Sequence, residues 1–337
     1  MAEPRRTAAR EAFVASAGWD GARHLPLDGD ASMRRYIRLI GPKDRRAMLM
    51  DAPPELGEDT RPFLAVTELL HAAGLSAPQV LAADPVQGFL LLEDLGDALY
   101  VREATTPARE RLLYEAAVDV LAQLHRNPPA GQQRLGPYDA ATYATEAALF
   151  VEWYVAGGRP EPPSADLRAE YLGHIAEATA KLAPSVLVLR DYHAENLLWL
   201  AERRGLARVG LLDYQDALIG HPAYDLVSLL EDARRDTTPE LREAMQRHYL
   251  ETTGAASEPF LAAYAALGAQ RNLKILGIFA RLARRDGKRA YLAHLPRVWQ
   301  HLMRDLEHPE LTALRAFVAR WAPIPDAALC ARLEAAS

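Results

Sequence analysis

Cysteine and lysine are both scarce in this sequence. Its 337 residues include one cysteine, Cys330, so no disulfide can form within the chain, which suits a reducing compartment or a protein indifferent to redox conditions. The lysines are Lys43, Lys181, Lys274 and Lys288, and most basic residues are therefore arginines. Any site that depends on a lysine has few candidates here.

Long apolar runs are missing as well. No stretch reaches the roughly 20 apolar residues of a membrane-spanning helix, and the opening MAEPRRTAAREAF lacks the apolar core of a signal peptide. The net charge of −6 argues against a surface for nucleic acid. We therefore expect a soluble cytoplasmic protein that binds neither membrane nor nucleic acid. Nothing indicates an obligate protein partner.

The sequence does have enough apolar character for a sizeable core. Hydrophobic residues make up 50% of the chain, and the length allows two domains or one large one. In the first part, short apolar segments bounded by turn residues predict strands. The predicted strands are 24–27, 34–40, 46–51, 80–83 and 89–92, and the predicted helices are 5–18 and 60–73.

From residue 97 the apolar residues recur at helical spacing. The predicted helices are 107–125, 139–155, 164–181, 239–252, 258–284, 287–307 and 310–335. Another helix begins near Pro222, and Asp225 in its first turn is expected to cap it or to compensate the helix dipole. The pattern predicts an α+β fold with two lobes. A small β-rich lobe with an antiparallel meander covers residues 1–95, and a larger helical lobe covers 96–337.

Residues 186–216 concentrate the side chains that carry chemistry. Three apolar runs, 186–189, 197–200 and 209–212, are predicted to be buried strands. Arg190 and Asp191 follow the first run, Asn196 precedes the second, and Asp213 follows the third. Two carboxylates and an amide are therefore expected at strand ends or on the loop between strands.

An Arg-Asp-x-x-x-x-Asn loop followed by a strand-end Asp is typical of protein kinases. In that template Asp191, preceded by Arg190, accepts the proton of the attacking hydroxyl. Asn196 and Asp213 hold the Mg²⁺ ions that bridge the phosphates of ATP, and their oxygens are the ligands that Mg²⁺ prefers. The same spacing also arises from ordinary turn residues, so the three surrounding strands are what favours catalysis.

Two other stretches fit a nucleotide. The polar turn 28–32 ends at Ser32, and its backbone N–H groups are placed to cover phosphates, although an ordinary hairpin turn is the alternative. The last predicted strand of the β-rich lobe runs into Glu93-Asp94-Leu95-Gly96, where a two-lobed kinase passes from one lobe to the other. We expect adenine to contact backbone groups around Glu93 and Leu95, with the Glu93 side chain solvated.

The set Asp191, Asn196, Asp213 and Gly220-x-Pro-x-x-Asp225-Leu resembles the aminoglycoside phosphotransferase and choline kinase group. Within that group, five segments resemble the anomeric sugar kinases. They are GDASMRRYIRL (29–39), MDAPPE (50–55), GFLLLEDLG (88–96), DYHAENLLWL (191–200) and QRNLKILGIFARLARRDGK (270–288). The resemblance implies a protein-kinase-like fold. It also implies ATP- and Mg²⁺-dependent phosphorylation of the C1 hydroxyl of an amino sugar, N-acetylmuramic acid and/or N-acetylglucosamine, in peptidoglycan recycling.

This chain departs from the group at the residues that position phosphate. Met50 stands where the group has a strand lysine, the partner glutamate of that lysine falls near Ala65, and Leu189 replaces a histidine. Arg34 or Arg35 is the natural substitute for the lysine, because a guanidinium group binds phosphate as a fork. The alternative is that both arginines face solvent and Mg²⁺ alone neutralises the phosphates.

The acceptor site is only loosely indicated. Tyr192, His193 and Glu195 flank the predicted base and are candidates either for sugar contact or for local packing. Arg271 and Asn272, on a predicted helix, are candidates either for a carboxylate such as the lactyl group of N-acetylmuramate or for buried hydrogen bonds between helices.

Three other functions stay open. An antibiotic kinase of the same fold would need an acidic pocket for a polycationic acceptor, and no dense acidic cluster is visible. A pseudokinase that binds nucleotide without chemistry is favoured by the missing lysine and opposed by the intact Asp191, Asn196 and Asp213. An unrelated helical regulatory protein would leave these strand-end side chains unexplained. No visible motif indicates whether the protein prefers ATP or GTP, and none indicates its oligomeric state.

Overall fold

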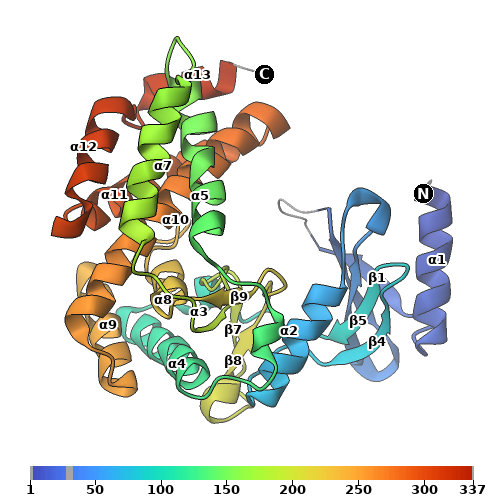
Figure 1. The fold of residues 1–337 in the computed structure, drawn as a ribbon. Coiled ribbons are helices and arrows are strands. Elements are labelled where there is room, and N and C mark those ends of the chain that lie inside the picture. The colour runs from blue at the N-terminus through green and yellow to red at the C-terminus, as the bar shows by residue number, and fades with distance from the viewer. Residues whose placement is uncertain (1–2, 28–32, 336–337) are drawn as a thin grey trace. The chain divides into compact units, whose positions relative to one another are not determined.

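The computed structural model describes residues 3–27 and 33–335 (Figure 1). The chain divides into two compact units, and neither is one continuous segment. Unit 1 consists of Met1–Ala116, Pro129–Gly131 and Glu195–Ala217, and unit 2 consists of Ala117–Pro128, Gln132–Ala194 and Leu218–Ser337. The segment Glu195–Ala217 thus folds with the N-terminal part of the chain, whereas Asp191 belongs to unit 2.

Unit 1 is built on an antiparallel sheet. Its described strands are β1 (Arg23–Pro26), β2 (Arg35–Ile40), β3 (Arg46–Asp51), β4 (Val80–Asp84) and β5 (Phe89–Glu93), and its first helices are α1 (Glu3–Ser16) and α2 (Arg61–Ala72). The strand order is β1-β2-β3-β5-β4, and all neighbouring pairs are antiparallel. The predicted meander and the predicted strands are confirmed, with ends that shift by at most one residue.

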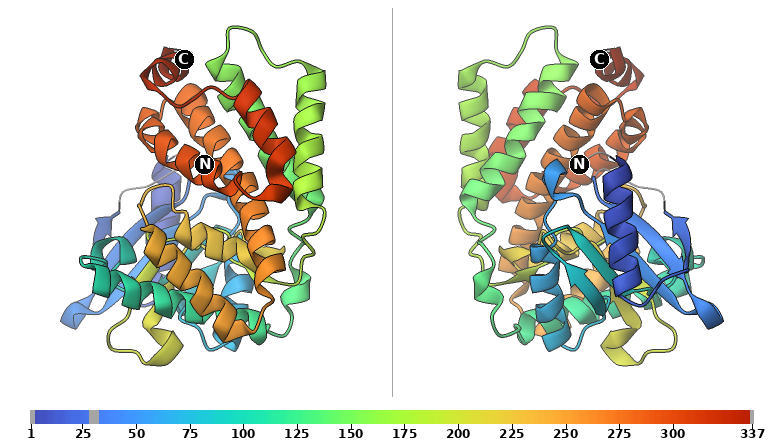
Figure 2. Two further views of the ribbon diagram at one scale, coloured as in Figure 1. Left: turned by 90° about the vertical axis from the view of Figure 1, so that its left-hand side faces the viewer. Right: turned by 90° about the vertical axis from the view of Figure 1, so that its right-hand side faces the viewer.

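Alternation along the strands sorts the side chains of this sheet onto two faces. Ala47 and Leu49 of β3 are buried in one cluster with Phe13 of α1, and Figures 1 and 2 show α1 lying along the sheet. At the edge of this cluster the buried carboxylate of Asp51 accepts a 2.9 Å hydrogen bond from Nε of Arg6. Helix α1 therefore covers one face of the sheet through apolar contacts and a buried ion pair.

A second, smaller sheet in unit 1 comes from the later segment. Strands β7 (Leu197–Trp199) and β8 (Val209–Leu211) pair antiparallel, with Leu197 opposite Leu211. Isolated bridges join Leu198 to Leu99 and Gly210 to Ser76. The short helix α3 (Tyr100–Glu103) and the first part of α4 (Pro107–Arg126) complete the unit.

The remaining predicted strand of the 186–216 segment pairs elsewhere. Strand β6 (Val186–Val188) lies in unit 2 and pairs with β9 (Leu218–Gly220), which the sequence pattern did not predict. Three residues ending in glycine are too short a pattern to identify as a strand. The close pairing requires Gly220, because a Cβ there would lie 2.8 Å from Cγ2 of Val188.

Apart from this small sheet, unit 2 is mainly helical. After the end of α4 come α5 (Ala140–Leu149), the π-helical segment η4 (Phe150–Val155), α6 (Ala156–Gly158), α7 (Ala165–Thr179), α8 (Ala223–Leu230), α9 (Pro239–Thr253), α10 (Ser257–Asp286), α11 (Leu295–Asp305), α12 (Thr312–Trp321) and α13 (Ala327–Ala335). Among the described helices, none combines the length and the apolar character needed to cross a lipid bilayer.

Two predicted helices are interrupted. The predicted helix 310–335 is divided, because α12 ends at Trp321 and α13 starts at Ala327. Pro323 and Pro325 lie between them, and a proline supplies no N–H to continue a helix. The predicted helix 287–307 starts instead as a 3-10 segment, Arg289–His294, before α11.

Helix α10 runs beside α5 and α11 in unit 2 (Figures 1 and 2). At Gly277 the backbones of α10 and α5 approach so closely that a Cβ would lie 2.3 Å from the carbonyl carbon of Leu149. The π-helical segment begins at the next residue, Phe150, and such segments often mark functional regions. The contact fixes the position of α10 along α5.

Candidate active site

The ends of β7 and β8 bring together the two predicted metal ligands. Because Leu197 pairs with Leu211, the next residues out, Asn196 and Leu212, lie side by side, and the Leu212 N–H donates to the Asn196 carbonyl at 2.9 Å. Asp213 follows directly in the chain. Asn196 and Asp213 therefore occupy the same end of this small sheet.

Asp213 has a backbone conformation that few residues other than glycine adopt. Its φ is 56°, in the left-handed region, and such residues gather at functional sites. Its side chain is 46% exposed, and its Oδ1 accepts a 3.0 Å hydrogen bond from Nε2 of Gln215. A partly exposed carboxylate therefore faces outward from the strand end that also carries Asn196.

This amide and carboxylate form a donor set that fits Mg²⁺. Magnesium usually takes one or two protein carboxylates and completes its shell with phosphate and water oxygens. Within residues 3–27 and 33–335 no cluster of three or more His, Cys, Asp or Glu side chains is able to hold a metal. Asn196 and Asp213 therefore suit an ion that arrives with phosphate better than an ion held by the protein alone.

A cavity of about 380 Å³ lies within unit 1 at this strand end. Its apolar lining includes Met48, Leu92, Leu198 and Leu212, and its polar lining includes Arg34, Asn196 and Asp213. The segment 93–96 also lines it. An apolar cavity with a few convergent polar groups is the usual form of a small-molecule site.

Arg34 is fixed among acidic neighbours at the polar part of this cavity. Its Nε lies 3.0 Å from Oε2 of Glu58, and its Nη1 lies 3.8 Å from Oδ1 of Asp213. Burial works to lower the pKa of Arg34, but Tyr36, Asp213 and Glu58 outweigh it, so the pKa is raised. Arg34 therefore keeps its positive charge, and Glu58 holds its guanidinium beside the carboxylate expected to bind metal.

The other phosphate candidates lie elsewhere. Arg35 is exposed and is not part of the cavity lining, since alternation along the strand turns it to the opposite face from Arg34. Met50, at the position of the family's lysine, is buried opposite Tyr36 on the neighbouring strand. Ser32 lies outside the described residues, and so does the whole turn 28–32.

The segment expected to contact adenine is part of the cavity wall. The Glu93 carboxylate accepts from Nη2 of Arg203 at 2.5 Å and from the N–H of Gln79 at 3.2 Å, so it is held by the protein rather than solvated as expected. The backbone of Leu95 has no hydrogen-bond partner among the described residues. Leu95 therefore combines a place in the cavity wall with a backbone N–H and a carbonyl that no described residue binds.

In unit 2 the loop after β6 is held by a buried carboxylate. Asp225 is fully buried, and it accepts hydrogen bonds from the N–H of Leu189 at 2.6 Å and of Arg190 at 2.8 Å. Arg190 has a left-handed φ of 70°, and the two bonds hold that conformation. Burial raises the pKa of Asp225 to about 7, against the effect of the two N–H groups. Asp225 thus fixes the residue before Asp191, which is more than a capping role.

Arg271 supports the same loop through the side chain of Ser228. Its Nη2 donates to Oγ of Ser228 at 2.8 Å, and Ser228 Oγ in turn donates to the carbonyl of Arg190 at 3.0 Å. Asn272 donates to the buried carboxylates of Glu231 at 2.7 Å and Asp305 at 2.9 Å. The predicted alternative of buried hydrogen bonds between helices describes both residues, and neither position favours sugar contact.

The three residues expected to flank the base differ in position. Tyr192 is buried, and its hydroxyl donates to the carbonyl of Ala117 at 2.8 Å, which favours a packing role over sugar contact. His193 is also buried, with 8% of its surface exposed. Glu195 lines the cavity of unit 1. Of the three, Glu195 alone belongs to unit 1, where it lines the cavity together with Asn196 and Asp213.

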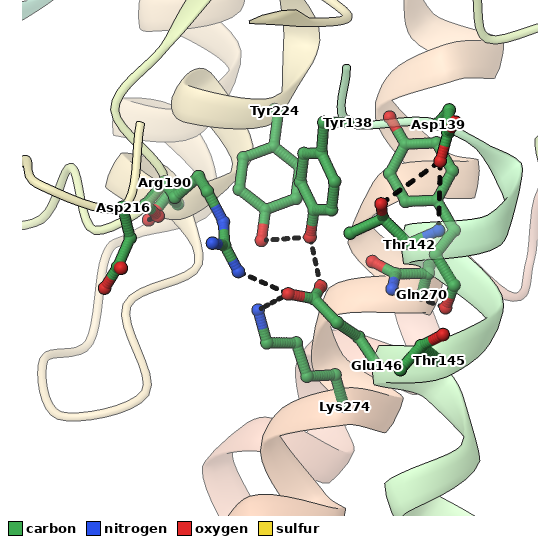
Figure 3. Close-up of polar contacts among 12 residues, drawn as sticks. Tyr138, Asp139, Thr142, Thr145, Glu146, Arg190, Asp216, Tyr224, Gln270 and Lys274 are labelled. Atoms are coloured by element: carbon green, nitrogen blue, oxygen red, sulfur yellow. Dashed lines mark hydrogen bonds and ion pairs between the residues drawn. The ribbon is translucent and has the colours of Figure 1, made fainter. Parts of the chain in front are cut away.

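The side chain of Arg190 belongs to a polar cluster in unit 2 (Figure 3). Its guanidinium binds the carboxylate of Glu146 and lies 5.1 Å from the ring centre of Tyr138. Lys274 binds the same carboxylate at 2.8 Å, and the Tyr138 hydroxyl donates to it. Burial works to raise the pKa of Glu146, but Lys274 and Arg190 outweigh it and hold the pKa low. Glu146 is therefore ionised and holds two cations.

The sequence pattern did not single out Glu58, Glu146, Lys274 or Ser228. Each lies far along the chain from its partner, so only the folded chain brings these contacts together. The signals that could have found Lys274 are the scarcity of lysine and its place in the segment 270–288.

Comparison with known proteins identifies the family of this chain. Residues 24–264 match the model of the phosphotransferase enzyme family. The chain is 40% identical to an N-acetylmuramate/N-acetylglucosamine kinase of Caulobacter vibrioides, over 95% of this chain and 97% of that protein. It is 38% identical to a protein of the same name from Pseudomonas aeruginosa, over 92% of each chain.

Solved structures share the fold at low sequence identity. A choline kinase from Streptococcus pneumoniae superposes with a TM-score of 0.63 at 13% identity, covering 90% of this chain and 100% of that one. An ADP-bound aminoglycoside phosphotransferase gives 0.57 at 15% identity, covering 88% and 97%. The predicted kinase-like α+β fold is confirmed. By its family match and by these relatives, the chain belongs to the phosphotransferase enzyme family.

Proposed function

We propose that the protein is an ATP-dependent sugar kinase. It transfers the γ-phosphoryl group to the anomeric C1 hydroxyl of N-acetylmuramate, N-acetylglucosamine or both, in peptidoglycan recycling. The observation that carries the kinase proposal is the cavity of unit 1, where Arg34, Asn196 and Asp213 line an otherwise mostly apolar space. The sugar substrates are proposed from the names of the two relatives at 40% and 38% identity.

The cavity suits ATP in one orientation. The base would lie between apolar walls with its polar edge toward the backbone of Leu95. The phosphates would then lie toward Arg34, Asn196 and Asp213. When bound, Mg²⁺ supplies neutralisation of phosphate charge, and Asn196 and Asp213 are the residues that would hold it. Arg34 takes the place of the absent lysine, because its paired guanidinium keeps a positive charge at that point.

Asp191 is the proposed general base, and Arg190 positions it. Asp191 is half-buried, and its N–H donates to the Leu189 carbonyl at 2.9 Å, next to the backbone that Asp225 holds. A carboxylate fixed through its own backbone suits the removal of a proton from a bound hydroxyl. The anomeric hydroxyl is the most acidic of the sugar because the ring oxygen withdraws charge, so little proton transfer is required before attack.

The proposal also assigns a role to each lobe and a location to the protein. We propose that residues 1–95 act as the nucleotide lobe and residues 96–337 as the lobe with the catalytic loop and acceptor site. The substrates are a nucleotide and a small amino sugar, without a nucleic-acid, membrane or obligate protein partner. We propose a cytoplasmic location, consistent with the single cysteine.

An antibiotic kinase is disfavoured by the cluster around Glu146. A polycationic acceptor requires unpaired carboxylates, yet Glu146 already binds Lys274 and Arg190. A pseudokinase is opposed by the strand-end arrangement of Asn196 and Asp213. Magnesium-dependent turnover separates the proposed kinase from a pseudokinase.

The test is release of ADP from ATP with Mg²⁺ in the presence of each sugar. Wild-type protein should release ADP with N-acetylmuramate or N-acetylglucosamine and not with aminoglycosides. Asp191→Asn should lower kcat by about 10²- to 10⁴-fold, the usual contribution of a general base, with little loss of nucleotide affinity. Turnover of Asp191→Asn within a few-fold of wild type would refute its assignment, and no turnover with either sugar would refute the function.

A further inference from the structure

One carboxylate oxygen in unit 2 binds two cations. Oε1 of Glu146 lies 2.8 Å from Nζ of Lys274 and accepts a hydrogen bond from Nη2 of Arg190 (Figure 3). The second oxygen, Oε2, accepts from the neutral hydroxyl of Tyr138. The carboxylate of Glu146 therefore lies between the ammonium group of Lys274 and the guanidinium group of Arg190.

The helices fix Lys274 in this cluster. On α10 the Gln270 side chain donates to the Tyr143 carbonyl of α5 at 3.2 Å. About one turn further along both helices, Lys274 meets Glu146. One turn further again, Gly277 packs so closely that an added Cβ would lie 2.3 Å from the carbonyl carbon of Leu149. The side chain of Lys274 is only 15% exposed. Its position is thus set by helix packing, unlike that of a surface lysine.

Arg190 is fixed just as firmly, and from the other side. Asp225 holds its N–H, Ser228 holds its carbonyl, and its guanidinium lies over the Tyr138 ring. Arg190 is also the residue directly before Asp191, so the cluster lies within one residue of the proposed base. Lys274 therefore belongs to a cluster that includes the residue next to the proposed base.

Such a cluster is a site for an anion. An ammonium group has three N–H donors, and Glu146 is the one ion-pair partner of Lys274 among the described residues. The ammonium group of Lys274 therefore has donors beyond the one that meets Glu146, and charge-assisted bonds to a carboxylate are strong. The groups suited to the phosphates of ATP, which are Arg34, Asn196 and Asp213, belong to unit 1. The cluster in unit 2 is therefore better suited to an anion on the acceptor.

The two proposed acceptors differ by such an anion. N-acetylmuramate carries a lactyl carboxylate on O3, and C3 is two ring bonds from the anomeric carbon. A sugar with its C1 hydroxyl at Asp191 would thus have this carboxylate a short distance away. N-acetylglucosamine has a hydroxyl there and no charge.

We propose that Lys274 and Arg190, both held by Glu146, bind the carboxylate of the acceptor sugar and so determine the preference for N-acetylmuramate over N-acetylglucosamine. This deepens the proposed function and rests on it. The sequence named Arg271 as a candidate for binding this carboxylate. We assign the contact instead to Lys274, about one turn further along α10, because Arg271 already supports the backbone of Arg190 through Ser228.

The test compares kcat/KM for the two sugars in wild type, Lys274→Gln, Lys274→Arg and Lys181→Gln. Lys181 is the matched control, because it lies in the same unit but is 78% exposed and pairs only with Glu310 at the surface. The ratio of kcat/KM, N-acetylmuramate over N-acetylglucosamine, should fall by about 10- to 100-fold in Lys274→Gln, as expected for a charge-assisted hydrogen bond. Lys274→Arg should keep most of the ratio, and Lys181→Gln all of it.

A second comparison changes the sugar instead of the protein. N-acetylmuramate with its lactyl group converted to the amide lacks the charge, so wild type should discriminate the acid from the amide and Lys274→Gln should not. An equal fall for both sugars in Lys274→Gln, or an unchanged ratio, would overturn the subsite. If Lys274→Gln does not fold, wild type that treats acid and amide alike overturns it equally.

Failure of the proposed function gives a different result. If wild type phosphorylated neither sugar, calorimetric binding of N-acetylmuramate and of its amide would still test the subsite. Tighter binding of the acid that is lost in Lys274→Gln would support the subsite, and equal binding of acid and amide would overturn it.

Discussion

The carboxylate of Asp225 accepts a 2.8 Å hydrogen bond from the backbone N–H of Arg190, a residue held at a φ of 70°. The same carboxylate accepts from Leu189, so one buried side chain on α8 fixes two consecutive residues at the end of β6. A left-handed arginine costs free energy unless its surroundings hold it. Asp225 supplies that restraint immediately before the proposed base.

Removing this carboxylate should destabilise the protein and slow turnover together. In Asp225→Ala two N–H groups lose their acceptor, and each orphaned donor costs about 1–3 kcal/mol, so the free energy of unfolding should fall by roughly 2–6 kcal/mol. Urea denaturation measures that loss, and Asp225→Asn, which keeps one acceptor oxygen, should lose less. Full stability of Asp225→Ala would mean that the loop is held by other contacts.

The pair Arg34–Glu58 should matter for nucleotide affinity. Arg34→Gln removes the cation that lies 3.8 Å from Asp213, and we expect KM for ATP to rise about tenfold, the size of one charge-assisted contact. Arg35→Gln is the matched control, since it removes a neighbouring guanidinium from outside the cavity. Equal effects of the two changes would show that the contribution is general charge and that Arg34 has no particular position at the phosphates.

Asp213 should couple the nucleotide to the metal. In Asp213→Ala the strand end loses its carboxylate ligand, so the tightening of ATP binding by Mg²⁺ should disappear while binding of metal-free ATP remains. Calorimetry with and without Mg²⁺ measures both. If the mutant bound ATP with Mg²⁺ as tightly as wild type, the metal role of Asp213 would be wrong.

His301 should make stability depend on acid pH. Burial, together with Arg304 and Arg242, lowers its pKa from 6.5 to about 3. Below pH 6.5 the unfolded chain therefore binds a proton that the folded state excludes, and stability present above 6.5 is lost as the pH falls toward 3, at up to about 1.4 kcal/mol per pH unit.

The measurement for His301 is the free energy of unfolding from pH 7 to pH 4. His301→Asn keeps an acceptor in place of the ring nitrogen. Between pH 6 and pH 4 its free energy of unfolding should fall less steeply with pH than that of wild type, and the difference in slope should correspond to about one bound proton. Burial raises the pKa of the neighbouring Glu231 and Asp305, and their opposite contribution cancels between the two proteins. Parallel pH profiles would mean that His301 takes up its proton in the folded state.

Local patterns were enough for most of the fold. Apolar segments between turn residues predicted the five strands of the larger sheet of unit 1 because each segment has its own boundary signals. The continuous helix predicted for 310–335 was wrong. The apolar residues there recur at helical spacing, but Pro323 and Pro325 interrupt the helix. Strand β9 was missed because three residues are defined as a strand only by their partner β6.

In the candidate site, sequence patterns identified some residues but not the contacts between distant ones. Asp191, Asn196 and Asp213 were identifiable because kinase chemistry fixes their types and spacing, although their roles stay predictions. The choice between Arg34 and Arg35 needed the alternation of a strand to show which of them lines the cavity. Glu146 and Lys274 are 128 residues apart in the chain, and no local pattern joins two positions at that separation.

The central claim is phosphorylation of the anomeric hydroxyl, and NMR of the product tests it most directly. With N-acetylglucosamine or N-acetylmuramate and ATP, the phosphorus of the product should couple to H1 of the sugar. Methyl glycosides of N-acetylglucosamine, which lack a free C1 hydroxyl, should not be phosphorylated. Phosphate on C6 or C3, in the free sugar or in the glycoside, would contradict the claim.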